Sequence, residues 1–203
     1  MTKTLSSIPT SQGQLTVKDF YRLVPDGQKA DLIDGVINMA SPDSIEHDDL
    51  GGFLYFLLRG YVETKNLGRV SGSRFAYKLN ENNAPEPDIA FVRKEHVRLL
   101  HEGGLTLAPD IAIEVVSPES EERDYVKKKC LYEESGVKEY WIIDLQGMNV
   151  EFYRLVSEKY EPIPLEEGDI FRSTVLEGFW LNANWLFVSP MPNAYETLQK
   201  ILE

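Results

Sequence analysis

Residues 109–145 read PDIAIEVVSPESEERDYVKKKCLYEESGVKEYWIIDL, and this segment decides the fold. Ile111–Val116 is a nearly unbroken apolar run rich in β-branched residues, which is typical of a buried strand. Ser117–Pro118 predicts the start of a helix, with serine as N-cap and proline at the first helical position, and Gly136 predicts its end. Tyr140–Leu145 is a second apolar strand. The order strand, helix, strand predicts a right-handed parallel crossover.

One carboxylate, Glu114, lies inside the first apolar run. A charge in such a strand is rare unless it is paired or binds a metal ion, so Glu114 is either an ion-pair partner or a ligand. In the helix that follows, Asp124, Lys128 and Tyr132 are four residues apart and therefore share one face. These four residues are the first candidates for a functional site.

Other segments predict the rest of one mixed sheet. Gly68–Leu79 reads as a strand in which Phe75–Leu79 alternates and joins the sheet, and Ile89–Val92 reads as another. Val150–Leu155 is expected to run antiparallel to the second apolar strand. We expect the helix at Leu50–Tyr61 to cover one face of the sheet and the helix at Ser117–Ser135 to cover the other. The fold class is therefore α/β (α+β), a mixed β-sheet flanked by helices.

The helix at 50–61 is strongly amphipathic, with apolar residues at i, i+3, i+4, i+7, i+8 and i+11. Gly51 and Gly52 lower its intrinsic helix propensity by about 1 kcal/mol each. We expect that these glycines let the helix approach the sheet closely. Further upstream, Thr16 can cap a short helix, and Asp34–Gly35 predicts a type I′ hairpin turn.

The chain has 203 residues, 42% hydrophobic and 27% charged, as in globular proteins. We expect a disordered N-terminal segment at 1–14 and a single domain at 15–203. The first 14 residues lack an apolar signal core and no apolar run is long enough to cross a membrane, so we expect no secretion. The single cysteine, Cys130, fits a reducing cytoplasm, where we expect the protein. The net charge of −12 argues against tight nucleic-acid binding over the whole surface. It leaves room for a local basic groove or a contact bridged by metal.

Three groups could carry chemistry: Asp88 at the start of one strand, Glu114 within another, and Lys128 on the helix. Two carboxylates on adjacent strands can hold one or two magnesium ions, which prefer oxygen ligands. A nearby lysine can orient water and offset developing negative charge, as phosphodiester hydrolysis requires. The alternatives are that Asp88 only caps a turn and that Lys128 is a solvated helix residue.

Two further residues have two interpretations each. Asp110 precedes Glu114 by four strand positions, on the same face and about 13 Å away, so it either supports the ligands or is simply the residue where the strand begins. His47 stands at the start of the amphipathic helix, where it either contacts a scissile phosphate or water or is an ordinary first-turn residue. Three scattered histidines and one cysteine make a zinc site improbable.

These residues carry a resemblance. Pro87–Asp88 followed by Glu114-x-Val116 is similar to the PD-(D/E)XK nuclease signature, with valine in place of the usual lysine. Several branches of that superfamily carry the lysine on the next helix. Over about residues 15 to 190 the chain resembles the Uma-type family of restriction endonucleases. The matching positions are Leu32–Gly35, Met39, Ser41–Pro42, His47, Pro87–Asp88, Pro109–Asp110, Glu114–Pro118, Asp124, Lys128, Tyr132, Gly136–Val137, Glu139–Trp141 and Asp144.

The resemblance implies a restriction-endonuclease-like fold and a hydrolase that cleaves phosphodiester bonds in DNA with Mg²⁺ or Mn²⁺. It implies that Asp88 and Glu114 are metal ligands and that Lys128 is the catalytic lysine. A homodimer would bring two active sites to two strands. The second hypothesis is a non-catalytic binding module that keeps the nuclease fold within a mobile-element or defence complex. The acidic composition favours the module, whereas the intact set of three residues favours the enzyme.

Overall fold

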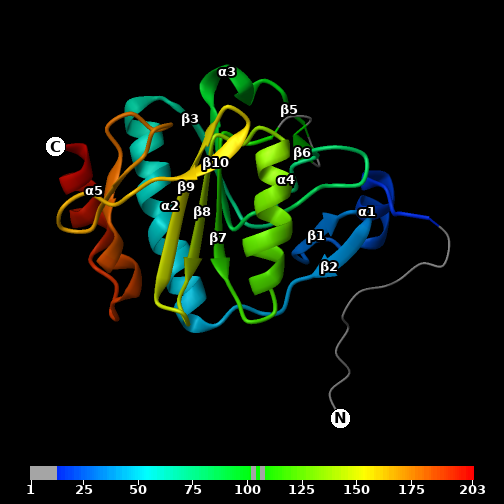
Figure 1. Cartoon of the computed structure of the whole chain (residues 1–203), viewed down its shortest axis with the longest axis horizontal. Helices are drawn as coiled ribbons and strands as arrows, with labels where there is room; N and C mark the ends of the chain where they lie inside the picture. The colour runs from blue at the N-terminus through cyan, green and yellow to red at the C-terminus, as the bar shows by residue number, and fades with distance from the viewer. Residues whose placement is uncertain (1–12, 102–103, 106–107) are drawn as a thin grey trace, which may run out of the picture.

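The computed structural model describes residues 13–101, 104–105 and 108–203 (Figure 1). Residues 1–12 of the segment expected to be disordered lie outside these ranges. The described helices are α1 (Val17–Leu23), α2 (Ile45–Lys65), α3 (Lys94–Val97), the π-helical segment η1 (Arg123–Lys128), α4 (Lys129–Glu134), the 3₁₀ segment η2 (Ala183–Phe187) and α5 (Ala194–Leu202). The described strands are β1 (Ala30–Ile33), β2 (Val36–Met39), β3 (Gly68–Gly72), β4 (Ile89–Arg93), β5 (Leu100–His101), β6 (Gly104–Leu105), β7 (Ile111–Val116), β8 (Glu139–Asp144), β9 (Asn149–Val156), β10 (Lys159–Pro162), β11 (Ile170–Arg172) and β12 (Trp180–Asn182).

Six strands form one mixed sheet in the order β10-β9-β8-β7-β4-β3. β7 and β8 run parallel, with Ile113 opposite Trp141, and the other neighbouring pairs in this sheet are antiparallel. The predicted strands at 89–92, 111–116 and 140–145, and the antiparallel return at 150–155, are therefore confirmed. The segment 109–145 forms the parallel crossover at the centre of the sheet.

The prediction that Phe75–Leu79 is a strand of this sheet is wrong. The edge strand is β3, which ends at Gly72, and Arg74 has a φ of 69° where the chain turns out of the strand. Tyr77 donates its backbone N–H to the carbonyl of Pro85 at 2.9 Å, and its side chain is buried. The alternating apolar residues at 75–79 therefore belong to a loop, and this loop buries side chains against the protein much as a strand would.

Helices cover both faces of the sheet, as predicted (Figure 1). Leu54 of α2 shares a buried cluster with Ile113 and Val115 of β7. Ala112 of the same strand points to the opposite face, where it packs with Tyr132 of α4. Since side chains alternate along a strand, Glu114 also belongs to this second face, beneath η1 and α4.

The prediction that Gly51 and Gly52 let α2 approach the sheet closely is wrong. A Cβ atom at either position would meet nothing within 4 Å, so no neighbouring group requires a glycine there. The close approach within α2 occurs at Gly60 instead, where a Cβ atom would collide with the Leu198 side chain of α5. Gly51 and Gly52 therefore need another explanation.

The helix after β7 begins later than predicted. The Ser117 N–H donates to the Ser120 hydroxyl at 2.9 Å within a turn, and helical structure starts at Glu121. Ser117 is thus part of a turn and not an N-cap. Residues 123–128 are π-helical, and such segments are rare and concentrated at functional sites. Cys130, the single cysteine of the chain, lies on the exposed side of the helix that follows.

The N-terminal part forms a smaller layer beside the main sheet (Figure 1). Thr16 and Asp19 form a capping box at the start of α1, as the sequence indicated for Thr16. Asp34 and Gly35 have φ values of 51° and 71°, which confirms the type I′ turn between β1 and β2. This hairpin contributes directly to the cavity described below.

The C-terminal part contains short strands and a final helix. Asn193 caps α5 by accepting the Glu196 N–H at 3.1 Å. Among the described helices, none combines the length and the apolarity needed to cross a membrane.

Candidate active site

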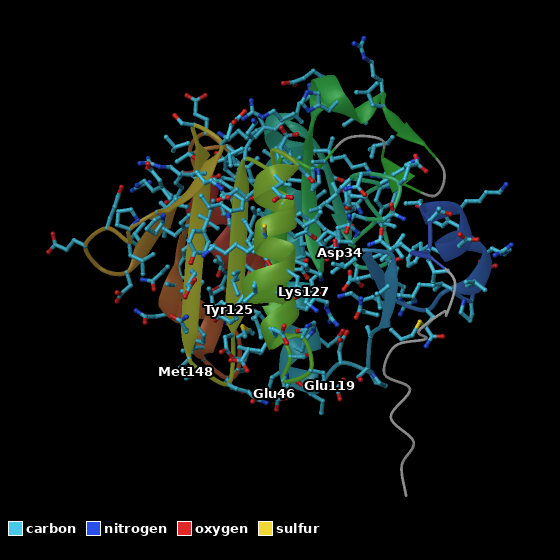
Figure 2. The ribbon with its side chains drawn as sticks, turned by 45° about the vertical axis from the view of Figure 1, so that its right-hand side comes forward. Asp34, Glu46, Glu119, Tyr125, Lys127 and Met148 are labelled. Atoms are coloured by element: carbon cyan, nitrogen blue, oxygen red, sulfur yellow. The ribbon has the colours of Figure 1, made fainter. Side chains whose placement is uncertain are left out.

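A cavity of about 460 Å³ opens at the end of the sheet where β7 finishes and β4 begins. Its walls come from four places: the β1–β2 hairpin, the first turn of α2, the end of β7 and the segment η1. Glu46 and Glu119, which both line this cavity, lie at the lower end of the molecule in Figure 2. The fold thus brings together segments that are far apart in sequence.

Asp88 lies immediately before β4 and is buried. One oxygen, Oδ1, pairs with the Lys29 ammonium, and the other, Oδ2, accepts the backbone N–H of Val115 at 2.8 Å. His47 Nε2 is 3.7 Å from the same Oδ2. Burial alone would raise the pKa of Asp88, but the charges of Lys29 and His47 outweigh burial and hold that pKa well below its usual range. Asp88 is therefore an ionised carboxylate.

Glu114 is almost completely buried, with 1% of its surface exposed. Tyr132 donates its hydroxyl to Oε1 at 2.9 Å, and Lys128 Nζ is 2.9 Å from Oε2. Burial raises the pKa of Glu114 well above its usual range, although the Lys128 charge acts in the opposite direction. Glu114 thus holds a proton more readily than an exposed glutamate does.

Lys128 is not the solvated helix residue of the alternative interpretation. Its side chain is buried, and Nζ lies 2.9 Å from Glu114, 3.1 Å from Asp31 and 3.5 Å from Asp124. Burial lowers the pKa of the ammonium, but the three surrounding carboxyl groups more than compensate and raise it above its usual value. Lys127 on the outer side of the same helix is exposed (Figure 2).

The carboxyl groups around Lys128 outnumber the cations. Asp31, Glu114 and Asp124 face the charges of Lys128 and Arg123, whose Nε is 3.3 Å from Asp31. Burial raises the pKa of Asp124 as well as that of Glu114. Burial is the main cause of both shifts, because it disfavours the ionised form, and the neighbouring carboxylates act in the same direction.

His47 interacts with groups on both strands at the cavity. Its Nε2 is 3.0 Å from the Val115 carbonyl oxygen, and its Nδ1 is 3.5 Å from Asp43. Burial lowers the pKa of this imidazole, but Asp88 and Asp43 raise it to a net value above the usual one. His47 therefore carries a positive charge more readily than an exposed histidine and lies beside the Asp88 carboxylate.

The structure brings together most of the predicted residues, with one exception. Asp88, Glu114, Lys128, His47 and Asp124 line the cavity, and Tyr132 bonds to Glu114. Asp110 does not reach this group. It accepts the Arg93 N–H at 2.8 Å and lies 3.3 Å from His96, so it ties the end of β4 to the start of β7.

The charged residues of the cavity that sequence reasoning missed include Lys29, Asp31 and Arg123, which pair with the predicted site residues or with one another. Asp31 lies in the apolar strand β1, so the signal that singled out Glu114, a carboxylate inside an apolar run, could have found it. Lys29 precedes that strand, and Arg123 lies in a highly charged helix start. Neither position has a local feature that separates it from a surface cation.

The two carboxylates in the cavity suit magnesium better than a metal that needs three or four ligands from the protein. Asp88 and Glu114 supply hard oxygen atoms to one cavity, from adjacent antiparallel strands. Within the described ranges, no cluster of three or more histidine, cysteine, aspartate or glutamate side chains could hold an ion. Magnesium commonly takes one or two carboxylates and keeps several waters, so the residues present fit it.

Comparisons with known proteins show the family and the fold of the chain. Residues 17–184 match the family model Uma2, described as "Putative restriction endonuclease". A search of curated proteins gave no match. A solved structure, the crystal structure of a putative nuclease belonging to DUF820 from Anabaena variabilis ATCC 29413, is similar with a TM-score of 0.69 and 19% sequence identity. The similarity covers 85% of this chain and 97% of that chain, and it shows a shared fold.

Proposed function

The chain belongs to the Uma2 family of restriction endonucleases, and on that premise we propose that it is a metal-dependent endonuclease that hydrolyses phosphodiester bonds in DNA. Asp88 and Glu114 are the proposed ligands of Mg²⁺ or Mn²⁺, and Lys128 is the proposed catalytic lysine. The family and the nuclease-like fold support nuclease activity in general. The metal, the DNA substrate and these roles are our proposal.

One observation carries this proposal: Asp88, Glu114 and Lys128 line the same cavity, although they come from two strands and a helix. The Lys128 ammonium touches Glu114 and is shielded from water by its neighbours. A structural ion pair alone would not require a second carboxylate on the adjacent strand. The shared cavity therefore favours a site that binds a ligand.

In the proposed reaction, the residues of the cavity would have different roles. A bound divalent ion would lower the pKa of a water and stabilise negative charge on the phosphate. Lys128, fixed by three carboxyl groups, would offset charge that develops next to Glu114. Tyr132 orients Glu114 through a hydrogen bond. His47, whose Nε2 is 3.7 Å from Asp88 Oδ2, could supply a proton within the cavity.

The test is a cleavage assay on plasmid DNA, linear duplex DNA and RNA, with Mg²⁺ or Mn²⁺ titrated from a chelated sample. We expect DNA cleavage that depends on metal and disappears in Glu114→Gln. Glu46→Gln, which changes an exposed acid at the rim of the same cavity, is the matched control and should remain active. Equal activity in Glu114→Gln and wild type would rule out this site.

One observation favours the alternative of a non-catalytic binding module. Lys29 already pairs with Asp88 and Lys128 already pairs with Glu114, so the two carboxylates are neutralised without a metal. If calorimetry detects no binding of Mg²⁺ or Mn²⁺ to wild type, while labelled DNA still binds, the module is the better description.

We also propose a homodimer, because cleavage of both DNA strands requires two active sites. Analytical ultracentrifugation of the full chain would detect it. A monomer at micromolar concentration, in the presence and absence of DNA, would contradict this part of the proposal.

A further inference from the structure

Three arginines surround a second cavity, between α2 and the edge strand β3. Arg59 of α2, Arg69 of β3 and Arg74 just beyond that strand line a hollow of about 460 Å³. The rings of Tyr55 and Phe75 also line it. This concentration of positive charge contrasts with the net charge of −12 of the whole chain.

Two of the three arginines, Arg59 and Arg69, contact aromatic side chains. Arg59 donates from Nη1 to the Tyr55 hydroxyl at 2.6 Å, and Arg69 lies 5.7 Å from the centre of the Phe75 ring. Arg59 also pairs with Glu63 at 2.8 Å, but this exposed pair is weak. In the part of the chain that the structure describes, no carboxylate pairs with Arg69 or Arg74. The charges of Arg69 and Arg74 therefore have no carboxylate partner among the described residues, whereas Glu63, which also lines the hollow, pairs with Arg59.

A ridge of α2 connects this hollow to the active-site cavity. His47, Gly51, Tyr55 and Arg59 follow one another at intervals of four residues, so they form one inclined row, with about 6 Å of helix axis between neighbours. His47 lines the first cavity, whereas Tyr55 and Arg59 line the second. At Gly51, between them, the space above the helix is open.

The sheet connects the same two places. Gly72 at the end of β3 is opposite Ile89 of β4, and Ile89 is opposite Ile113 of β7. One residue further along this register, Asp88 lies opposite Glu114. Arg74 follows Gly72 at the same end of the sheet. Adjacent strands are about 4.8 Å apart, so the hollow begins one strand away from the strand that Asp88 opens.

We infer that this track, formed by Gly51, Tyr55, Arg59, Arg69 and Arg74, binds the phosphodiester backbone of a nucleic-acid strand that extends from the active-site cavity. The inference rests on the proposed nuclease function and specifies where that site holds its substrate. Guanidinium groups bind phosphate through paired charge-assisted hydrogen bonds. The rings of Tyr55 and Phe75 lie beneath the guanidinium groups of Arg59 and Arg69 and support them beside the hollow. Gly51 lets the strand lie directly on the helix, which explains a glycine with open space above it.

The acidic surface makes such a track necessary. A polyanion is repelled by most of a surface with this net charge, so its contacts must be concentrated where cations are unpaired. An acidic peptide would also be attracted to the arginines, but it would not need a path to the active-site cavity. The observations therefore favour nucleic acid.

The experiment measures binding of a fluorescein-labelled DNA duplex and of its single strand, by anisotropy, in the presence of a chelator that prevents cleavage. The variant R59A/R69A/R74A is compared with R154A/K159A/R172A, which removes the same charge from exposed positions on β9, β10 and β11. We expect the slope of log K against log salt to fall by about 1 for each arginine–phosphate interaction that the first variant removes. The control should keep the wild-type slope.

Two further variants separate binding from folding. Arg74→Glu changes one exposed side chain without an ion-pair partner among the described residues, and it should weaken binding while the unfolding temperature stays constant. Gly51→Leu fills the open space on the ridge and should also weaken binding, with α2 still folded. Circular dichroism melts verify that both variants are folded.

The outcomes distinguish this inference from the proposed function. If wild type binds DNA and the triple variant does not, yet no metal supports cleavage, the track stands and the nuclease proposal fails. If wild type cleaves DNA but the triple variant keeps the wild-type salt slope, the track is overturned and the nuclease stands. Equal displacement of the DNA by polyglutamate, through the same arginines, would also overturn the track.

Discussion

Lys128 shows how burial changes the expected effect of a substitution. If Lys128 acted only as a catalytic lysine, its removal would abolish cleavage and leave folding nearly intact. With Nζ within 3.5 Å of Asp31, Glu114 and Asp124, the ammonium is also a structural counter-charge. We expect Lys128→Met to destabilise the fold by about 3–5 kcal/mol, because it leaves buried carboxylates uncompensated.

Guanidinium-induced unfolding measures this destabilisation, and Lys127→Met is the control. Lys127 is exposed, so its replacement should change stability by no more than about 0.5 kcal/mol. If Lys128→Met is destabilised by less than about 1 kcal/mol, the prediction is wrong, because an uncompensated buried charge costs more than that. The carboxyl groups would then be neutralised by protons and would not need the ammonium.

Glu86 predicts a pH dependence of stability. Burial raises the pKa of this carboxyl to about 7, against an ordinary value of 4.5. Its contribution to stability is fully present below about pH 4.5 and is lost as pH rises through about 7, because the unfolded chain releases the proton first. Glu86→Gln keeps an acceptor for the Ala30 N–H. It should therefore be more stable than wild type above pH 7, by roughly 1–3 kcal/mol.

Urea titrations at several pH values measure this difference. The control is Glu81→Gln, which removes an exposed acid of the same loop that pairs with Lys78. Parallel stability curves for wild type and Glu86→Gln, from acid to neutral pH, would contradict the prediction.

At the scale of elements, α2 is a helix weakened by two glycines near its N-terminal end. Because a Cβ atom at Gly51 or Gly52 meets nothing within 4 Å, alanine at either position should stabilise the protein by about 1 kcal/mol. For a chain of this size that gain raises the unfolding temperature by roughly 2–4 °C. Calorimetric melts check it. Gly60→Ala is the control and should be stabilised less or destabilised, because its Cβ would collide with Leu198.

The segment η1 is the second element with an unusual geometry. Its π-helical turn carries Asp124 and Lys128, both buried at the cavity, while Lys127 between them remains exposed. The sequence spacing of four residues indicated the shared face correctly. It did not indicate the wider turn, because side-chain periodicity is similar in the two helix types over so short a segment.

At the scale of the whole molecule, the active-site cavity depends on the complete fold, because a hairpin, two helical segments and the central sheet build its walls. An ion that binds only the native state stabilises all of them together. If the proposed metal site is correct, Mg²⁺ at about 100 times its dissociation constant adds about 2.7 kcal/mol. That gain raises the unfolding temperature by roughly 5–10 °C.

Differential scanning fluorimetry with increasing Mg²⁺ measures this shift. Glu114→Gln should show none, and Glu46→Gln should behave as wild type. The same shift in all three proteins would place the ion elsewhere on the acidic surface.

The sequence by itself determined the local structure and the centre of the sheet. Apolar runs indicated β4, β7 and β8, and turn and cap residues indicated the hairpin at Asp34–Gly35 and the start of α1. These features follow from backbone geometry within a few residues, so a linear pattern records them. Glu114 stood out for a related reason, since a carboxylate inside an apolar strand conflicts with its neighbours.

Only the tertiary structure decided which charges meet. Lys29 reaches Asp88 across 59 residues, and Asp31 reaches Lys128 from the hairpin. The same packing buried Lys128, kept Asp110 outside the cavity and left open space above Gly51. Pairing of charges depends on which elements pack together, and that arrangement is set by the burial of apolar surface over the whole chain, which no short stretch of sequence contains.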